Sequence, residues 1–416
     1  MNNSVSFNFG RDLLGPVFYS FCFKLWSVQQ NYSDNDAITL FMSRGGLRLK
    51  YFYEIFLSTQ GYIAPTPVES LFTSRIAAFK SSLADMNEFA INEIAAEYRH
   101  TTIDEAILRL CGHEVYLSWF EKLAPKQESD YLSKMMDNEA LYKILTSKDA
   151  SSLVLKGYFN HQKELFTNYF QKTSRNHKNV LLVDTGWGGS IVKALLPHAN
   201  NTSQNLMALF FGKYSYQGKH SGDWYNDIMG LEVEGDEYHA LKPNTSIFLN
   251  RHLIESVCEV DCQSVRGYIQ GSTESEIEFE GCYFQPEHSI PNKDDPLVCG
   301  IESYFMSSQK KGVDEIHKEA SAAWHHIKRV IFFPRAKHLA IMNTKRSIDF
   351  GRAGEVPVLL AKAKGISAKR YNLKHSLWLP AQLVIEFPNI YLVFQLAYLI
   401  KLQYGLVRRV LIRTLR

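Results

Sequence analysis

The sequence predicts an α/β protein with a Rossmann-like parallel sheet, a large helical insertion and a basic amphipathic C-terminal helical region. Apolar runs of strand length recur along the chain, and each ends in polar or glycine residues. Segments with helical spacing or helix-forming composition follow the first three runs. Strands that alternate with helices indicate parallel pairing, because a parallel connection needs a long crossover.

Four apolar runs are predicted strands, and polar residues follow each of them at residues 43–46, 73–75, 184–190 and 212–215. The strands themselves are expected at residues 37–42, 68–72, 179–183 and 206–211. The carboxyl ends of parallel strands meet at one edge of a sheet, where open α/β sheets bind their ligands. We therefore expect one cleft to be faced by Arg44, Arg75, Asp184 and Lys213.

The glycine-rich stretch 184–190 joins a buried strand to a predicted helix at 191–196. Backbone N–H groups from the turn and from the start of the helix would converge on one point, which suits a phosphate. Asp184, at the carboxyl end of the strand, would meet a sugar hydroxyl or a metal ion. The structural alternative is a tight turn, with glycine for positive φ and Ser190 as a helix cap.

The length of 416 residues allows one large or two ordinary domains. Apolar spacing predicts helices at 86–108 and 128–145, and the stretch 216–300 is expected to be irregular apart from one helix at 252–268. The predicted parts are the first part of the core at 1–80, a helical insertion at 81–175, the second part of the core at 176–270, an irregular or helical accessory region at 271–350, and a basic tail at 351–416.

Charge and cysteine content narrow the functional class. The formal net charge is +3, from 46 basic and 43 acidic residues, and no RNA-binding signature occurs, so we expect no nucleic-acid partner. The six cysteines are scattered behind a polar N-terminus that lacks the regions of a secretory signal. These features predict a cytoplasmic protein with reduced thiols.

The C-terminal tail carries ten basic residues and a single acid, Glu386, from residue 361 onward. Aromatic and aliphatic residues interleave with the basic ones, a combination typical of helices that lie on anionic membrane surfaces. The longest apolar run, 390–400, is short against the roughly 20 residues of a transmembrane helix. We expect peripheral attachment to a membrane surface; the alternative is a buried helical hairpin with solvated basic residues.

Three motifs resemble those of a known group of bacterial polysaccharide-locus proteins. They are Phe41-Met42-Ser43-Arg44-Gly45-Gly46, Leu71-Phe72-Thr73-Ser74-Arg75 and Leu182-Val183-Asp184-Thr185-Gly186-Trp187-Gly188-Gly189-Ser190, with Gly15-Pro16 before an aromatic helix. Members of the group are glycan phosphoribosyltransferases, which use phosphoribosyl pyrophosphate as the ribofuranose donor for O-antigens and capsules. The resemblance covers residues 10–270 and implies a sheet of phosphoribosyltransferase type.

The resemblance implies a pentosyltransferase of lipopolysaccharide or capsule biosynthesis that acts on a lipid-linked glycan. Together with the basic tail, it implies a cytoplasmic protein attached peripherally to the inner face of the bacterial cytoplasmic membrane. A separate haloacid-dehalogenase-type (HAD-type) phosphatase would remove the 5-phosphate from the product. That implication agrees with the Asp34-Asn35-Asp36 segment, which precedes its strand and so cannot supply a phosphatase nucleophile at the strand end.

The donor chemistry assigns roles to the motif residues. The reaction needs N–H donors for the 5-phosphate, an acid near the ribose hydroxyls, cations for pyrophosphate and Mg²⁺. The catalytic candidates are Asp184, which is also the candidate Mg²⁺ ligand, with Arg44 and Arg75 as bidentate partners of pyrophosphate. The donor-binding candidates are Ser43, Gly45, Ser74, Thr185, Gly186, Trp187, Gly188, Gly189, Ser190 and Lys213. The acceptor-binding candidates are His252 and Glu255, with Arg251 beside them.

The chain departs from the family pattern at two positions. Val183 stands where nucleotide-making phosphoribosyltransferases carry the first of two acids, and Gly46 stands where relatives of this group carry an acid. Trp187 would either stack on the sugar or cap the core. Two other functions stay open: a nucleotide-sugar-dependent glycosyltransferase, and a non-catalytic scaffold of a polysaccharide assembly complex.

Overall fold

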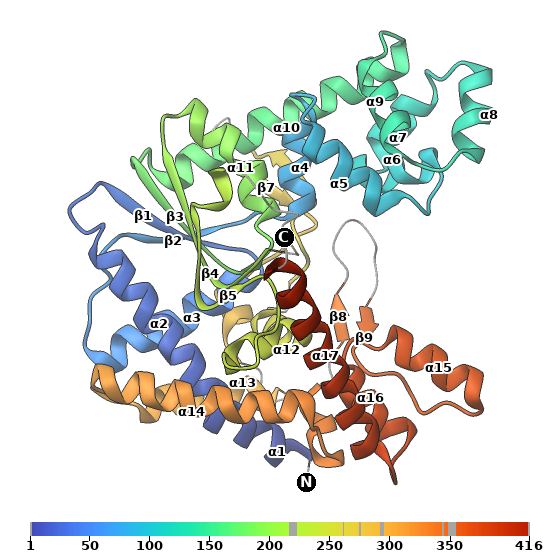
Figure 1. The fold of residues 1–416 in the computed structure, drawn as a ribbon. Helices are drawn as coiled ribbons and strands as arrows, with labels where there is room; N and C mark the ends of the chain where they lie inside the picture. The colour runs from blue at the N-terminus through green and yellow to red at the C-terminus, as the bar shows by residue number, and fades with distance from the viewer. Residues whose placement is uncertain are drawn as a thin grey trace.

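The computed structural model describes residues 2–215, 223–260, 262–273, 276–291, 295–342, 345–347 and 355–414. A five-stranded parallel sheet lies at its centre, in the order β2-β1-β3-β4-β5, with helices on both faces (Figure 1). The strands are β1 (Ala37–Met42), β2 (Val68–Leu71), β3 (Asn179–Trp187), β4 (Asn205–Tyr214) and β5 (Ile228–Gly235). The predicted α/β class and the parallel sheet are confirmed.

The expectation of an irregular region after residue 216 was wrong in three places. Strand β5 lies at the edge of the sheet, where Glu232 and Glu234 interrupt the apolar run that marks a central strand. The predicted helix 252–268 ends early, as α12 (His252–Cys258). Beyond it, β6 (Gly267–Gln270) pairs antiparallel with β7 (Ile277–Glu280).

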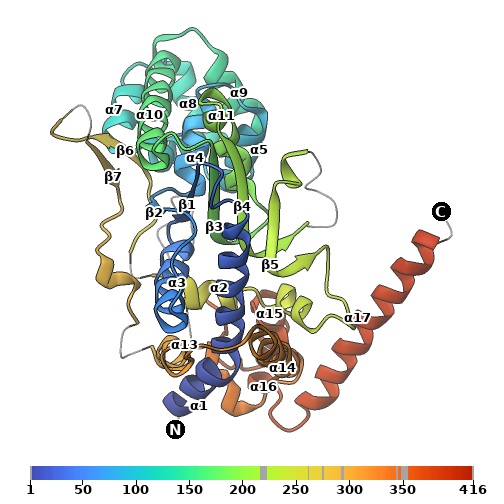
Figure 2. The same cartoon turned by 90° about the vertical axis from the view of Figure 1, so that its left-hand side faces the viewer.

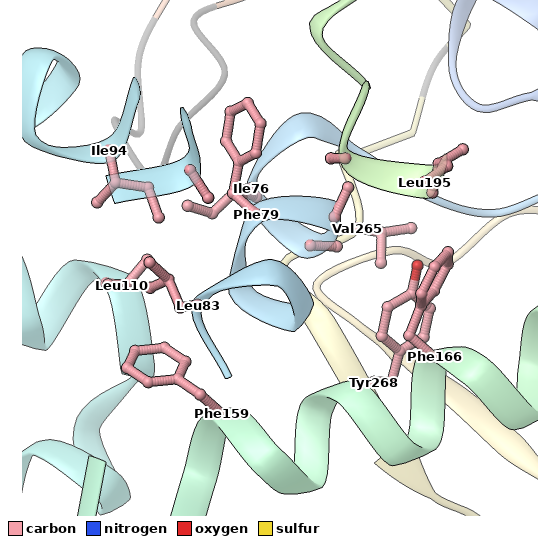
Figure 3. Packing of buried hydrophobic residues seen from close by; sticks show 14 of the residues in the cluster. Ile76, Phe79, Leu83, Ile94, Leu110, Phe159, Phe166, Leu195, Val265 and Tyr268 are labelled. Carbon is pink, nitrogen blue, oxygen red and sulfur yellow. The ribbon is translucent and has the colours of Figure 1, made fainter. Parts of the chain in front are cut away.

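One face of the sheet is covered by α4 (Arg75–Leu83), α10 (Ala150–Ser174) and α11 (Ser190–Asn201), which lie above it in Figure 1. Alternate strand residues such as Ile38 and Leu40 face this layer, as the twofold period of a strand requires. Figure 3 shows the packing of this layer. Its labelled side chains are Ile76, Phe79, Leu83, Ile94, Leu110, Phe159, Phe166, Leu195, Val265 and Tyr268.

The other face is covered by helices from both ends of the chain, below the sheet in Figure 1. This second core contains Phe41, Leu181 and Val183. Their neighbours in sequence face the core on the opposite side of the sheet. Both faces of the central strands are therefore apolar, which explains their unbroken hydrophobic runs. The covering helices are α2 (Gly15–Gln30), α3 (Gly45–Gln60), α12, α13 (Pro296–Ser307) and α14 (Val313–Phe332).

The helical insertion forms a lobe at one end of the molecule, at the upper right of Figure 1. Two long predicted helices are each broken in two, because the chain turns at 99–102 and at 134–137. The two breaks pair with one another: the Ile103 amide donates to Lys134 (3.0 Å) and the Met136 amide donates to Thr101 (3.0 Å). The lobe helices are α5 (Glu88–Tyr98), α6 (Ile103–Cys111), α7 (His113–Phe120), α8 (Pro125–Ser133) and α9 (Asn138–Thr146).

The C-terminal tail divides into a packed part and an exposed part. Trp378 and most of α16 are buried, as the hairpin alternative expects, whereas the last helix, α17, extends away from the body (Figure 2). The described helices include none with the length and apolar character needed to cross a membrane. The tail helices are α15 (Ile366–His375), α16 (Leu379–Glu386) and α17 (Tyr391–Thr414).

The remaining described elements are short. They are α1 (Asn2–Phe9), the π-helix η1 (Gly10–Leu14), the 3-10 helices η3 (Asp223–Tyr225), η4 (Pro243–Leu249), η5 (Pro286–Ser289) and η6 (Ala336–Met342), and the paired strands β8 (Lys345–Ser347) and β9 (Glu355–Pro357). The predicted division of the chain into five parts stays a prediction. The helices of 296–332 nevertheless pack directly on α2, within the second core.

His198 of α11 makes the apolar core between the sheet and the layer of α4, α10 and α11, the first core, sensitive to acid. Its ring bridges Ser81 of α4 and Thr167 of α10, at 2.9 Å each, and burial lowers its pKa to about 4. The unfolded chain binds a proton near pH 6.5 but the folded chain does not, so stability present above that pH is lost as pH falls toward 4. We expect the free energy of unfolding, measured with urea, to fall by about 3 kcal/mol across this window. The free energy of unfolding of His198→Gln should depend less on pH. Equal slopes in both proteins would contradict this.

Candidate functional site

The sheet order creates a switch point between β1 and β3. The chain leaves β1 into α3 on one face of the sheet and leaves β3 into α11 on the other (Figure 1). Open α/β sheets of this order bind ligands in the crevice outside the carboxyl ends of these two strands. The residues that follow β1 and end β3 carry the first and third sequence motifs, so the fold brings these motifs to one place.

Two glycines let the first turn of α3 contact the end of β3. A Cβ atom on Gly45 would lie 2.8 Å from Oδ1 of Asp184 and 2.9 Å from Cγ2 of Thr185. A Cβ atom on Gly46 would lie 2.7 Å from the backbone oxygen of Val183. Asp184 is half-buried and lies against the start of a 16-residue helix, where the helix dipole favours negative charge.

The turn after β3 is shorter than expected. We expected the strand to end before Asp184, but residues 184–187 continue it, with Gly186 opposite Gly212 and Trp187 opposite Lys213 of β4. The ladder holds these residues in the sheet because β4, with 10 residues against 9 in β3, extends far enough to pair with them. Only Gly188 and Gly189 remain between the strand and α11, and Gly189 has a φ of +72°.

Trp187 is packed in the interior, and Gly186 before it is half-buried. Trp187 is 5% exposed, lies on Gly212, and has its ring 6.3 Å from that of Phe248. Gly186 has a φ of +90°, and the Phe210 ring fills the space a Cβ would take. Of the two alternatives for Trp187, the structure therefore supports the core cap.

Ser43 and Ser74 hold the loops at the strand ends together. The Ser43 hydroxyl donates to the Thr73 carbonyl (2.7 Å) and accepts from the Thr73 amide (3.0 Å). The Ser74 hydroxyl donates to the Val265 carbonyl (2.5 Å) and caps α4 through the amide of Ala77 (3.2 Å). Both hydroxyls are thus committed to the scaffold, and their donor-binding roles stay predictions.

The predicted cations each lie beside an acid. Arg44 pairs with Glu259, at 2.7 Å, in the segment that follows α12. Lys213 pairs with Glu234 (3.1 Å) and lies 4.4 Å from the centre of the Tyr225 ring. These carboxylates offset the positive charge of the edge.

Arg75 is the first residue of α4, on the opposite side of the sheet from α3. Burial raises the pKa of Glu93, and Arg75 together with Lys193 opposes that rise. Lys193 lies 4.0 Å from the centre of the Phe89 ring. Arg75 and Lys193 thus both act on Glu93 above the sheet, whereas Arg44 belongs to the layer below it. The expectation that both arginines face one cleft stays a prediction.

The acceptor candidates pair with one another at the start of α12. The Nδ1 atom of His252 lies 2.8 Å from Oε2 of Glu255, and Nε of Arg251 lies 3.9 Å from the other carboxylate oxygen. Helix α12 packs on α3 and on β3, so this group lies in the layer that also carries Arg44. Their role in acceptor binding stays a prediction.

Arg48 is a residue that the sequence analysis missed. It lies one helical turn after Arg44 on α3 and is only 5% exposed, yet its Nε and Nη1 atoms have no hydrogen-bond partner among the described residues. Burial lowers its pKa, while Cys258 and Asp295 oppose that change. Asp184 also acts on Cys258, which shows that the arginine and the aspartate share one neighbourhood. Its i+4 spacing from Arg44 is the sequence signal that could have found it.

A magnesium ion fits this site in one binding mode. The described residues contain no group of three His, Cys, Asp or Glu side chains that could hold a metal ion by themselves. Mg²⁺ is commonly held by one or two carboxylates together with substrate phosphates and water. Asp184, half-buried with the Thr185 hydroxyl 3.5 Å away, suits that mode.

The fold defines an α/β protein with a five-stranded parallel sheet, and the β1/β3 switch point is its candidate ligand-binding edge. The chain matches no family model and no curated protein sequence. The functional argument below is therefore built on residues and geometry.

The contact between Gly45 and Asp184 is testable by adding one methyl group. Gly45→Ala forces a displacement of the aspartate or of the start of α3, so we expect a destabilisation of about 1–3 kcal/mol in urea unfolding. The matched control is Gly157→Ala in α10, where a Cβ meets nothing within 4 Å. That change is expected to stabilise by about 0.5–1 kcal/mol. The proposed close approach is wrong if both variants are stabilised.

Proposed function

We propose that this protein is a glycosyltransferase that moves a 5-phosphoribofuranosyl group from phosphoribosyl pyrophosphate to a hydroxyl group of a lipid-linked glycan. The reaction releases pyrophosphate and belongs to the synthesis of a bacterial surface polysaccharide, an O-antigen or capsule. The observation that carries the proposal is the contact of Asp184 with the first turn of α3 at the switch point, with Arg44 immediately before that turn.

The donor chemistry matches this arrangement. Bond breaking in the donor develops positive charge on ribose and negative charge on the departing pyrophosphate. Asp184 would bind the ribose hydroxyls and oppose the positive charge. The first-turn amides of α3 and the guanidinium of Arg44 would bind pyrophosphate, since both offer N–H donors and positive charge.

The 5-phosphate would lie at the start of α11. Gly188 and Gly189 are the only residues between β3 and this helix, so their amides and that of Ser190 are the available donors. Mg²⁺, held by Asp184 and the donor, would neutralise charge on the leaving group. Arg75, at the start of α4 on the same edge but the opposite face, stays a predicted partner of pyrophosphate.

Arg44 and Arg48 would bind the donor in different ways. Arg44 already contacts Glu259, so a pyrophosphate oxygen would replace or share that carboxylate. Arg48, behind it on α3, has two guanidinium N–H groups with no acceptor among the described residues. We assign Arg48 to the binding of the donor's negative charge, because an anion would supply acceptors for these two buried nitrogen atoms.

The product would keep its 5-phosphate, so a separate HAD-type phosphatase is the expected partner. In this chain β1 is followed by Ser43 and Arg44, and neither can serve as the aspartate nucleophile of such a phosphatase. The acceptor would approach from the α12 side, where His252 and Glu255 pair, since α12 packs on α3 and β3.

The decisive experiment supplies the full chain with phosphoribosyl pyrophosphate, Mg²⁺ and a short synthetic lipid-linked glycan. We expect a product heavier by one phosphopentosyl group, detected by mass spectrometry. Transfer from a nucleotide sugar instead would indicate a nucleotide-sugar-dependent enzyme. If the chain shows no transfer and is not thermally stabilised by the donor, it is a scaffold.

Asp184→Asn is expected to reduce transfer by roughly 100-fold or more, because the carboxylate charge opposite the developing ribosyl cation is lost. The thermal unfolding temperature should change little, since the side chain is half-buried and keeps its shape. The matched control is Asp130→Asn on α8, an exposed position in the helical lobe, which should retain full activity. Equal activity of the two variants would exclude this role for Asp184.

Arg48→Met separates a binding role from a structural one. Because two of its guanidinium nitrogen atoms have no acceptor among the described residues, loss of the side chain's charge should change the unfolding temperature little, whereas the affinity for phosphoribosyl pyrophosphate should fall about tenfold to 100-fold. Affinity is measured from ligand-dependent thermal stabilisation. Arg109→Met, on the exposed surface of α6, is the control. A destabilised variant with unchanged affinity would show that Arg48 is structural.

A further inference from the structure

Helix α17 projects from the body of the protein toward the C-terminus (Figure 2). Its first turns are attached by Gln395, which is fully buried and whose side-chain amide donates to the carbonyls of Pro380 (2.9 Å) and Pro334 (3.2 Å). Tyr398, one turn later, is half-buried. A polar side chain thus anchors this helix to the protein.

The outward face of α17 is apolar. Leu392, Leu396 and Ile400 follow one another at intervals of four residues and are 56%, 52% and 60% exposed. Such spacing places them on one side of the helix. Other large apolar residues exposed beside them are Ile390, Val393, Phe394 and Tyr404. This distribution is the reverse of a normal surface helix, which buries its apolar face.

The charge around this face is of one sign. Residues 361–416 contain ten basic residues and one acid, Glu386. Glu386 is 1% exposed and accepts hydrogen bonds from Asn372 (2.7 Å), Gln382 (3.1 Å) and the Ala363 amide (3.2 Å). Among the described residues of 361–416, the C-terminal unit, no side-chain carboxylate therefore lies at the surface.

Basic side chains on this unit are exposed. Lys362, Lys364, Arg370 and Lys374 lie at the surface on and before α15, and Lys401 lies on α17. Further arginines occur at 408, 409 and 413 in the sequence of α17; Arg416 lies outside the described residues. Exposed apolar side chains combined with uncompensated positive charge match one kind of surface, the headgroup region of an anionic bilayer.

We propose that the outward face of α17 binds the surface of an anionic lipid bilayer, with Leu392, Leu396 and Ile400 inserted among the headgroups. Lys401 on α17 and the exposed basic side chains on and before α15 would be attracted to the negative surface and help to hold the protein there. A second copy of the chain would meet the same positive charge, which disfavours self-association through this face. The inference does not depend on the proposed enzymatic activity.

The test uses the full chain and sedimentation with lipid vesicles, without donor or acceptor. We expect binding to phosphatidylcholine vesicles that contain phosphatidylglycerol and at least tenfold weaker binding to pure phosphatidylcholine vesicles. Binding should also weaken in 1 M salt, as surface electrostatics require. The double variant L396D/I400D should lose at least tenfold in affinity for the anionic vesicles while keeping the wild-type unfolding temperature.

The matched control is L117D/L132D in the helical lobe, which changes two similarly exposed leucines and should bind as the wild type does. Equal binding to neutral and anionic vesicles overturns the proposal, as does full binding by L396D/I400D. A concentration-dependent dimer that these substitutions abolish, without vesicle binding by the wild type, would instead identify a second copy as the occupant. None of these outcomes bears on sugar transfer, so the two proposals fail separately.

Discussion

The close approach of α3 to β3 is the constraint on which the site depends. Glycine at positions 45 and 46 lets the helix begin against the backbone of β3, and any side chain there would overlap Asp184 or the carbonyl of Val183. The contact holds a carboxylate beside helix N–H groups at the point where the sheet reverses its direction of winding. Without it, the first and third motifs would lie on the same edge but not in contact.

Two basic residues around this contact lie beside acids. Arg44 with Glu259 and Lys213 with Glu234 are close enough to offset each other. Arg48 is buried, and its Nε and Nη1 lack acceptors among the described residues, while Asp295 opposes the lowering of its pKa. A bound anion would supply the missing acceptors, which is the basis of the role proposed for Arg48.

The candidate ligand-binding edge of the sheet and helix α17 differ in where they place polar and apolar side chains. The edge gathers polar groups between two layers of helices and leaves the cores apolar on both sides of the sheet. Helix α17 turns its apolar residues outward and its polar Gln395 inward. A glycan acceptor carried on a lipid would be found at the surface that such a helix favours, so the two proposals describe compatible parts of one protein.

Local patterns in the sequence determined the strands and their polar ends. Central strands such as β1 are apolar on both sides and stand out, whereas the edge strand β5 alternates with acids and was missed. The sequence also indicated that Arg44 and Asp184 meet at one edge, since parallel strands require it. The tertiary structure alone decided that β3 extends to Trp187, that this ring enters the core, and that Arg48 is buried with two nitrogen atoms that lack acceptors in the described part of the chain. These three features depend on the length of β4 and on the packing of α12 and α13. Those elements are distant in sequence from β3 and α3, so no local pattern specifies the contacts.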